Sequence, residues 1–375
     1  MNNGYIYNLG QLFTAISNRC SERQALRYPD GTSYTFSELE KTSNKIAEYL
    51  LSKNLQPRGV VAVFNNKTFL SYSVMLACLK IGVVYTNLDP NSPIERLKKM
   101  ILQCNPDLFF VFSDAVSFLE QCAYDKDKTV VYNSDEFERT IAGKTDSLPA
   151  VNTIVSGTTP AYLMFTSGST GFPKGVTITH ANVLNFIEWT KITYNSTPED
   201  VFTNINPMHF DNSVFDFYAS LFIGATLAPV SEELAKNPRK LLDAMNVVKP
   251  TIWFSVPSML VYVLKMRALK DTDLPTLRIV TFGGEGFPKG QLRNLWAVWG
   301  NRITFINVYG PTECTCICSS YIVSDKDMND DNLLPLGPIA PNFGFVVINE
   351  ENQPVKDGEI GELCITGPNV SAGYY

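Results

Sequence analysis

The sequence predicts an α/β fold with two mostly parallel sheets, flanking helices and a small antiparallel β unit at the carboxyl-terminal end. Two observations support this fold class. Apolar spacing near the helical period alternates with short apolar runs for most of the chain, which is the pattern of helices and buried parallel strands. After about residue 325, short β-branched runs separated by turn residues replace this alternation, and such runs are typical of antiparallel strands.

Each element follows from its local pattern. Helical spacing predicts helices over residues 37–51, 69–79, 182–189 and 288–299. Apolar runs predict buried strands over residues 59–64, 108–112 and 251–254. Near the end, β-branched runs predict strands over residues 344–348 and 361–366. Residues 113–155 are polar and lack periodicity, so we expect a loosely packed connection there.

Length and composition indicate a globular protein of several compact units. The 375 residues are 45% hydrophobic, enough to bury a large core. We expect one α/β subdomain over residues 1–190, a second over residues 191–325 and an incomplete β subdomain over residues 326–375. The net charge of −6 gives no basic stripe for nucleic acid. Without a secretion signal or a long apolar run, we expect a cytoplasmic protein with no membrane partner.

Eight cysteines are scattered along the chain, and five of them lie well apart, as expected for free thiols in a reducing compartment. Cys314, Cys316 and Cys318 alternate, so an extended strand would send all three side chains to one face. A metal site would need a fourth ligand and usually a Cys-x2-Cys spacing. The pattern favours buried thiols over a metal site.

A loop rich in glycine and hydroxyl residues follows the apolar run 162–165 and ends with Lys174. Glycines let the backbone approach an anion, hydroxyls donate hydrogen bonds, and the lysine adds a positive charge. The loop residues are Thr166, Ser167, Gly168, Ser169, Thr170 and Gly171. Pro173 before the lysine and Gly175 after it exclude the P-loop spacing. We interpret the segment as a triphosphate-binding loop, with a flexible surface turn as the alternative.

Six blocks in order resemble the core motifs of the adenylate-forming (AMP-binding) superfamily, most closely the amino-acid adenylation domains of nonribosomal peptide synthetases and the D-alanine:carrier-protein ligases. They lie at residues 34–39, 79–90, 166–175, 210–216, 307–313 and 361–374. The family continues with a Tyr-x-Thr-Gly-Asp segment, a hinge and a mobile carboxyl-terminal domain with an essential lysine. The resemblance therefore implies the large amino-terminal domain, as an excised fragment or a truncated form.

The resemblance implies ATP-dependent activation of an amino acid as aminoacyl-AMP, with release of pyrophosphate and transfer to the phosphopantetheine of a carrier protein. Glu313 resembles the magnesium ligand, Thr312 the donor to the α-phosphate, and Lys174 the contact to the β- or γ-phosphate. The reaction needs positioning and charge compensation rather than a general base, because a carboxylate is already ionised at pH 7. The residues implied around adenine are Gly283, Gly284, Glu285, Asn307 and Tyr309, the last stacking on the base.

Asp211 resembles the residue that pairs with the α-ammonium of an amino acid, and an N-cap role for the following helix is the alternative. The side-chain pocket implied by the motifs is lined by Asn212, Phe215, Phe254, Val280, Phe282, Val308, Cys316 and Ile317. Since none of these side chains is ionised, we predict a neutral substrate. Phe282 stands where small residues are frequent in the family, and it predicts a small or slender substrate side chain.

Two further function classes stay open: an acyl- or aryl-CoA synthetase, against which Asp211 argues, and a nucleotide- or amino-acid-binding module without turnover. A Ser-His-Asp hydrolase would have to use His180 or His209, the only two histidines, and no Gly-x-Ser-x-Gly segment accompanies them. We expect His209 to border the acyl or adenine pocket, and His180 to cap or pack.

Overall fold

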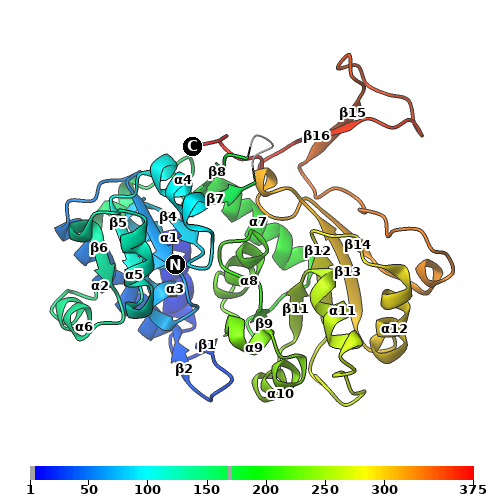
Figure 1. Cartoon of the computed structure of the whole chain (residues 1–375), viewed down its shortest axis with the longest axis horizontal. Helices are drawn as coiled ribbons and strands as arrows, with labels where there is room; N and C mark the ends of the chain where they lie inside the picture. Colours follow the sequence, from blue (N-terminus) through cyan, green and yellow to red (C-terminus); the bar gives the residue numbers. More distant parts are fainter. Residues whose placement is uncertain (1–4, 168–170) are drawn as a thin grey trace.

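The computed structural model describes residues 5–167 and 171–375. Two large sheets with helices on their faces form the body, and a hairpin extends from it near the carboxyl-terminal end (Figure 1). This arrangement confirms the predicted fold class. The six-stranded sheet has the order β6 (Thr129–Val131), β5 (Leu108–Val111), β3 (Val60–Phe64), β4 (Val84–Leu88), β7 (Pro160–Thr166) and β8 (Lys174–Thr179). Its neighbouring strands run parallel except β7 and β8, which form an antiparallel pair.

The eight-stranded sheet is parallel apart from its two edge strands. Its order is β14 (Ser319–Ile322), β13 (Thr304–Tyr309), β12 (Ile279–Gly283), β11 (Ile252–Ser255), β9 (Val201–Asn204), β10 (Thr226–Pro229), β1 (Gln24–Arg27) and β2 (Ser33–Thr35). Strands β1 and β2 come from the amino-terminal region, so this sheet crosses the predicted boundary at residue 190. The hairpin consists of β15 (Gly344–Ile348) and β16 (Glu362–Thr366).

The largest core cluster takes apolar side chains from both sheets and from the helices between and beside them. These helices are α1 (Leu9–Arg19), α2 (Phe36–Ser52), α3 (Phe69–Ile81), α6 (Asp135–Ala142), α7 (His180–Thr193) and α8 (Asn212–Leu221). On the other face of the six-stranded sheet pack α4 (Ile94–Cys104) and α5 (Val116–Gln121). The other face of the eight-stranded sheet is covered by α9 (Glu232–Ala235), α10 (Pro238–Val248), α11 (Pro257–Lys265) and α12 (Lys289–Trp299).

Short 3₁₀ turns connect several elements: η1 (Ser113–Ala115), η2 (Lys126–Lys128), η3 (Ala150–Ile154), η4 (Thr312–Cys314) and η5 (Asp325–Met328). Within the described ranges, no helix combines the length and the apolar character that a membrane crossing requires.

The prediction of a loosely packed connection over residues 113–155 was wrong. This segment contains α5, β6 and α6, and β6 extends the six-stranded sheet beside β5. Val130, Phe137 and Ile141 are buried in the largest core cluster. The apolar period of this segment is hard to recognise in the sequence for two reasons. Helix α6 buries only one narrow face, so its apolar residues stand among charged ones. Strand β6 has three residues, which is too few to show a period.

Lys67 joins the two large sheets. It follows β3 of the six-stranded sheet, and its side chain is buried. Its Nζ donates hydrogen bonds to the backbone carbonyls of Asn204, Ile205 and Val230, at 2.9, 2.9 and 3.0 Å. These carbonyls lie at the carboxyl ends of β9 and β10 in the eight-stranded sheet. The ammonium group therefore donates hydrogen bonds to backbone carbonyls at the ends of strands, where the hydrogen bonds between neighbouring strands stop.

Asp216 provides a negative charge that compensates the buried Lys67 ammonium. The carboxylate is fully buried on α8, and its Oδ2 accepts hydrogen bonds from Asn204 and Asn206. Burial raises the pKa of Asp216, while its two amide donors and the positive charge of Lys67 act in the opposite direction. Burial lowers the pKa of Lys67, and Asp216 opposes that shift. The two groups thus stabilise each other's charged form in a place that disfavours both.

Replacing Lys67 with methionine should lower the free energy of unfolding by about 3–5 kcal/mol, because three buried carbonyls and a buried carboxylate lose their partner. Urea unfolding of the purified chain measures this change. Lys41→Met, at an exposed position on α2, is the matched control and should change the free energy by about 0.5 kcal/mol or less. Equal effects of the two substitutions would contradict the structural role of Lys67.

Candidate active site

The predicted phosphate loop connects the antiparallel strands β7 and β8. Thr166 ends β7, Lys174 begins β8, and the two residues are paired in the strand register. Ser167 and Gly171 lie in the connection, and Gly171 adopts a left-handed backbone (φ 74°) that favours glycine. The predicted contacts Gly168, Ser169 and Thr170 lie outside the described residues. The hairpin fixes both ends of the loop to a buried sheet.

A cavity of about 490 Å³ brings the ends of several elements together beside this loop. Its lining includes Thr166 and Ser167 from the loop, Asp211 before α8 and Thr312 at the start of η4. The end of β4 and the segment that follows it form another part of the wall, with Leu88, Asp89 and Asn91 among the lining residues. Residues that the sequence separates by more than 200 positions thus share one cavity at the carboxyl ends of parallel strands, where α/β folds commonly bind ligands.

Asp211 faces the cavity rather than capping a helix. Its backbone is already helical, and its side chain makes no N-cap hydrogen bond to α8. Instead Oδ2 accepts a hydrogen bond of 2.7 Å from the Thr312 hydroxyl. Burial raises the pKa of Asp211, although hydrogen bonds from Thr312 and from the backbone N–H of Asn212 lower it. A raised pKa means that the ionised form lacks sufficient compensation, so a cationic ligand group would be favourable here.

Lys174 and Glu313 both contact Tyr374, which lies close to the carboxyl-terminal end. The Tyr374 hydroxyl donates a 2.7 Å hydrogen bond to Oε1 of Glu313. The Lys174 ammonium lies 4.9 Å from the centroid of the Tyr374 ring, within the range of a cation–π contact. Tyr374 forms an antiparallel bridge with Val176 of β8, and Figure 1 shows the carboxyl terminus near this strand. The predicted metal ligand and the predicted phosphate cation are therefore near each other.

The residues at this position suit a magnesium ion that is bound to a triphosphate. Mg²⁺ usually takes one or two carboxylates, with water and phosphate oxygens completing its shell. Glu313 offers a half-exposed carboxylate beside Lys174. Among the described residues, no group of three or more His, Cys, Asp or Glu side chains could hold a metal ion by itself. Glu313 would supply one carboxylate ligand to an ion whose other ligands are phosphate oxygens and water.

The residues implied around adenine lie at the ends of β12 and β13. Gly283 ends β12, and a Cβ atom there would lie 2.5 Å from the Val308 carbonyl oxygen, so the close approach of the strands requires glycine. Tyr309 ends β13 and is half-buried. The Asn307 amide donates a 2.8 Å hydrogen bond to the Pro335 carbonyl, and Glu285 accepts a hydrogen bond from Ser258. Asn307 thus anchors the segment that follows β14.

The structure does not bring all the predicted pocket residues together. Phe215 on α8 packs against Phe254 on β11, with ring centroids 5.1 Å apart. The residues beside them in the same core cluster are Val308, Cys316 and Ile317, while Asn212 is half-buried at the start of α8. Val280 and Phe282 belong instead to the cluster on the opposite face of the sheet. The Phe282 ring contacts Phe287, at a centroid distance of 4.9 Å.

Strand register explains this division. Thr281 pairs with Phe254 across β11 and β12, and Gly283 pairs with Val308 across β12 and β13. Side chains alternate between the faces of a sheet, so Thr281 and Gly283 face α8 whereas Val280 and Phe282 face away from it. The Thr281 hydroxyl confirms this orientation, because it donates to Tyr194 beyond the end of α7. Val280 and Phe282, which the motifs assigned to the pocket, are therefore each one position away from a residue that faces α8.

Cys314, Cys316 and Cys318 are free and buried, as predicted. They do not lie on one strand, because Thr315 and Cys316 have left-handed backbones (φ 56° and 75°) that interrupt the chain between η4 and β14. Burial raises the pKa of all three thiols. All three are therefore buried thiols, and Cys316 belongs to the same core cluster as Phe215.

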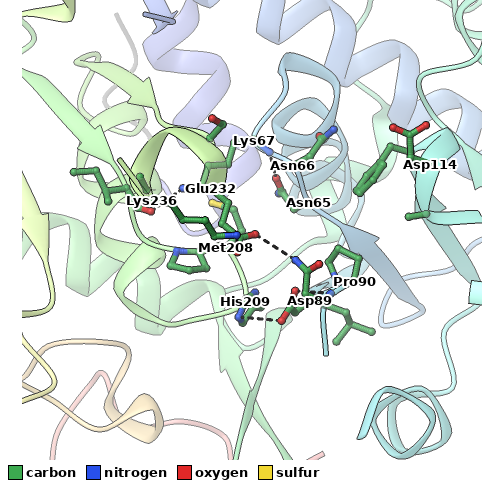
Figure 2. A pocket seen from close by; sticks show the side chains of 18 of the residues that line it. Asn65, Asn66, Lys67, Asp89, Pro90, Asp114, Met208, His209, Glu232 and Lys236 are labelled. Carbon is green, nitrogen blue, oxygen red and sulfur yellow. Dashed lines mark hydrogen bonds and ion pairs between the residues drawn. The ribbon is translucent and has the colours of Figure 1, made fainter. Parts of the chain in front are cut away.

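A second cavity, of about 640 Å³, lies beside the first at the junction of the two large sheets. Figure 2 shows its charged and amide side chains, among them Asn65, Asp114 and Glu232. Asp89 and His209 line both cavities. His209 Nε2 lies 3.8 Å from Asp89 Oδ2, and burial lowers the pKa of His209, which Asp89 opposes. The pair forms part of the partition between the cavities.

His180 has a structural role. Its side chain is fully buried, and Nδ1 accepts a 3.0 Å hydrogen bond from the backbone N–H of Leu9. Burial lowers the pKa of His180 to about 3, so the imidazole is neutral at physiological pH and accepts from the start of α1. This agrees with the prediction that His180 packs in the interior.

Sequence reasoning missed three features of the site: Tyr374, the Asp89–His209 pair, and Thr281 as part of the wall facing α8. Tyr374 and Asp89 lie within recognised motif blocks at 361–374 and 79–90, but nothing local indicates which side chain they contact. The alternation of Thr281 with Val280 and Phe282 was visible, and only the register of β12 against its neighbours assigns each residue to a face.

Comparison with known proteins identifies the family. The AMP-binding enzyme family matches residues 13–375, and this chain belongs to it, as the motifs predicted. An L-proline–[L-prolyl-carrier protein] ligase from Pseudomonas fluorescens is 32% identical over 94% of this chain and 71% of its own length. A D-alanine–D-alanyl carrier protein ligase from Bacillus licheniformis is also 32% identical, over 91% of this chain and 66% of its own length. The chain thus spans about two thirds or slightly more of these relatives.

Solved structures show the same fold. The N-terminal subdomain of NpsA from Klebsiella oxytoca, solved in complex with 3-hydroxyanthranilyl-AMSN, has a TM-score of 0.82 and 24% identity, and the match covers 98% of this chain and 89% of that one. The nonribosomal peptide synthetase FmoA3 has a TM-score of 0.85 and 22% identity over 98% of this chain and 38% of that one. At this level of identity, the likeness supports the fold alone.

Proposed function

We propose that this protein activates a small neutral α-amino acid as aminoacyl-AMP, releasing pyrophosphate, for transfer to the phosphopantetheine of a carrier protein. The observation that supports this most directly is the position of Asp211: a carboxylate with a raised pKa in the same cavity as the phosphate loop. A substrate ammonium would compensate that charge, leaving its carboxylate near Thr166 and Ser167. The carrier ligases to which the chain is similar act on proline and D-alanine, both neutral amino acids.

In the proposed reaction, a substrate carboxylate oxygen attacks the α-phosphorus of ATP, and the bond to the bridging oxygen of pyrophosphate breaks. No proton transfer is needed, so the protein contributes position and charge. Lys174 would contact the β- or γ-phosphate, and Glu313 would hold Mg²⁺, which offsets the charge of the triphosphate when bound. Thr166 and Ser167 would supply hydroxyl donors to the phosphates.

The hydrogen bond between Thr312 and Asp211 would couple binding of the amino acid to binding of ATP. In the structure, the Thr312 hydroxyl donates to Asp211 at 2.7 Å. An α-ammonium group is a charged donor and makes a stronger hydrogen bond to a carboxylate than a neutral hydroxyl does. When the ammonium takes this place, the Thr312 hydroxyl becomes available to the α-phosphate. Amino-acid binding would therefore favour productive placement of ATP.

The preference for a small side chain rests on the wall beyond Asp211. Phe215, Phe254 and Val308 are almost fully buried, and among the described residues they are not part of the cavity lining that includes Asp211. Little open volume is therefore available on that side. Phe282 does not narrow this side of the pocket, because its side chain lies on the other face of β12.

We also propose that the phosphopantetheine arm reaches the adenylate through the larger cavity of Figure 2. The two cavities share Asp89 and His209, so an arm in one could meet an acyl group in the other. A pantetheine arm has two amides separated by apolar carbons. The cavity offers matching amide groups at Asn65, Asn66 and Asn91 among apolar side chains such as Leu88 and Met259.

Asp211→Asn should weaken binding of non-hydrolysable aminoacyl-adenylate mimics at least about 100-fold, because their ammonium loses its buried counter-charge. Binding of the matched desamino mimics should change little. Isothermal calorimetry on the 375-residue chain measures both, with small and large neutral side chains of both chiralities. Asp114→Asn, an exposed carboxylate in the larger cavity, is the control and should have no effect. Tighter binding of desamino or aryl mimics by the unaltered chain would support an acyl- or aryl-CoA synthetase instead.

Phe254→Leu should change the relative affinities for mimics with different side chains by about tenfold, because it reshapes the wall that faces α8. Phe282→Leu should leave these ratios unchanged, since this ring lies on the opposite face. The two substitutions are chemically identical and both positions are buried, so each controls for the loss of stability of the other. A larger change in preference from Phe282→Leu would contradict the assignment of faces.

The NMR signals of the two histidines can test the proposed route of the phosphopantetheine arm. We expect the imidazole NMR signals of His209 to shift when an adenylate mimic binds and to shift again when pantetheine is added, because His209 borders both cavities. The fully buried His180 should respond to neither ligand. His209→Asn assigns the signals. A pantetheine addition that leaves His209 unchanged on the mimic-bound protein would exclude this route for the arm.

A further inference from the structure

Tyr374 is attached to the body by its backbone. The Thr177 N–H donates to the Gly373 carbonyl at 2.9 Å, and the Tyr375 N–H donates to the Gly175 carbonyl at 2.7 Å. Val176 and Tyr374 form an antiparallel bridge. On the other side, the Ser371 N–H donates to the backbone carbonyl of Glu313 at 2.8 Å. The segment therefore lies between β8 and η4, held by one β-bridge and by backbone hydrogen bonds, and this register determines where the Tyr374 side chain points.

This register brings one aromatic side chain into contact with two opposite charges. The ring of Tyr374 contacts the Lys174 ammonium, at 4.9 Å from its centroid, and the hydroxyl donates to the Glu313 carboxylate at 2.7 Å. Across the described part of the chain, Lys174 and Glu313 form no ion pair with each other. Without the Tyr374 side chain that both groups contact, the two opposite charges could attract each other, and a paired Lys174 would be less available to a phosphate.

We propose that Tyr374 is a positioning residue that keeps Lys174 and Glu313 apart, so that both charges stay available to a magnesium-bound triphosphate. This inference rests on the proposed function, because it assumes that the two residues handle phosphate and magnesium. The hydroxyl restrains one carboxylate oxygen and leaves the other for the ion. The ring supports the ammonium through a contact weaker than a salt bridge to phosphate, and a ligand can therefore replace it.

The hydroxyl and the ring are separable by substitution. Tyr374→Phe removes only the hydrogen bond to Glu313, so it should lower the magnesium-dependent gain in ATP affinity about three- to tenfold. ATP binding in the absence of magnesium should stay unchanged. Tyr374→Ala removes the ring as well and lets Lys174 pair with Glu313, so ATP binding without magnesium should also weaken. Adding Glu313→Gln to Tyr374→Ala should then restore the magnesium-free affinity, since Lys174 loses its unwanted partner.

Calorimetric titration of the 375-residue chain with ATP, with and without Mg²⁺, measures these affinities. Tyr375→Phe is the matched control: its backbone also pairs with β8, and its side chain is 50% exposed. It should behave like the unaltered chain, and thermal unfolding of each variant checks that the fold is retained. Magnesium-dependent binding that Tyr374→Phe and Tyr374→Ala leave intact, while Glu313→Gln abolishes it, would overturn this inference alone. An unaltered chain without magnesium-dependent binding would overturn the proposed function as well.

Discussion

The junction of the two large sheets at Lys67 is the constraint on which the site depends. A buried ammonium holds the last carbonyls of β9 and the segment after β10 against the end of β3. The chain that leaves β9 at Ile205 continues directly to His209 and Asp211. Moving this junction would move the candidate ammonium partner relative to the phosphate loop on the other sheet. Burying the Lys67 ammonium is unfavourable by itself. Its hydrogen bonds, however, fix the position of one sheet relative to the other, as a reaction between two bound substrates requires.

Two carboxylates of the candidate site each accept a hydrogen bond from a neutral hydroxyl rather than pairing with an opposite charge. Asp211 accepts from Thr312, and Glu313 accepts from Tyr374. Neutral hydroxyls satisfy a carboxylate without neutralising it. A cationic or metal-bearing ligand can replace or join such a contact at a lower cost than breaking a salt bridge. We infer that the protein keeps its charges uncompensated in order to bind charged ligands.

Alternation along β12 shows how a local assignment can miss the geometry. Every residue from Ile279 to Gly283 is buried, so hydrophobicity does not distinguish the two faces of a strand that is covered on both sides. The register against β11 and β13 assigns Thr281 to the side of α8 and Phe282 to the opposite helices. The proposed preference for a small substrate side chain therefore rests on the packing of Phe215 and Phe254, two rings from different elements.

The sequence by itself determined the α/β class and the family, and it predicted the phosphate loop and the role of Asp211, because these depend on local periodicity and on residues adjacent in the chain. Helices such as α2 and α3 differ from their predicted ranges only at their ends. The tertiary structure decided what long-range register controls: the addition of β1 to the distant β10, the faces of β12, and the placement of Tyr374 between Lys174 and Glu313. Contacts between residues hundreds of positions apart have no period in the sequence, so only the folded arrangement defines them.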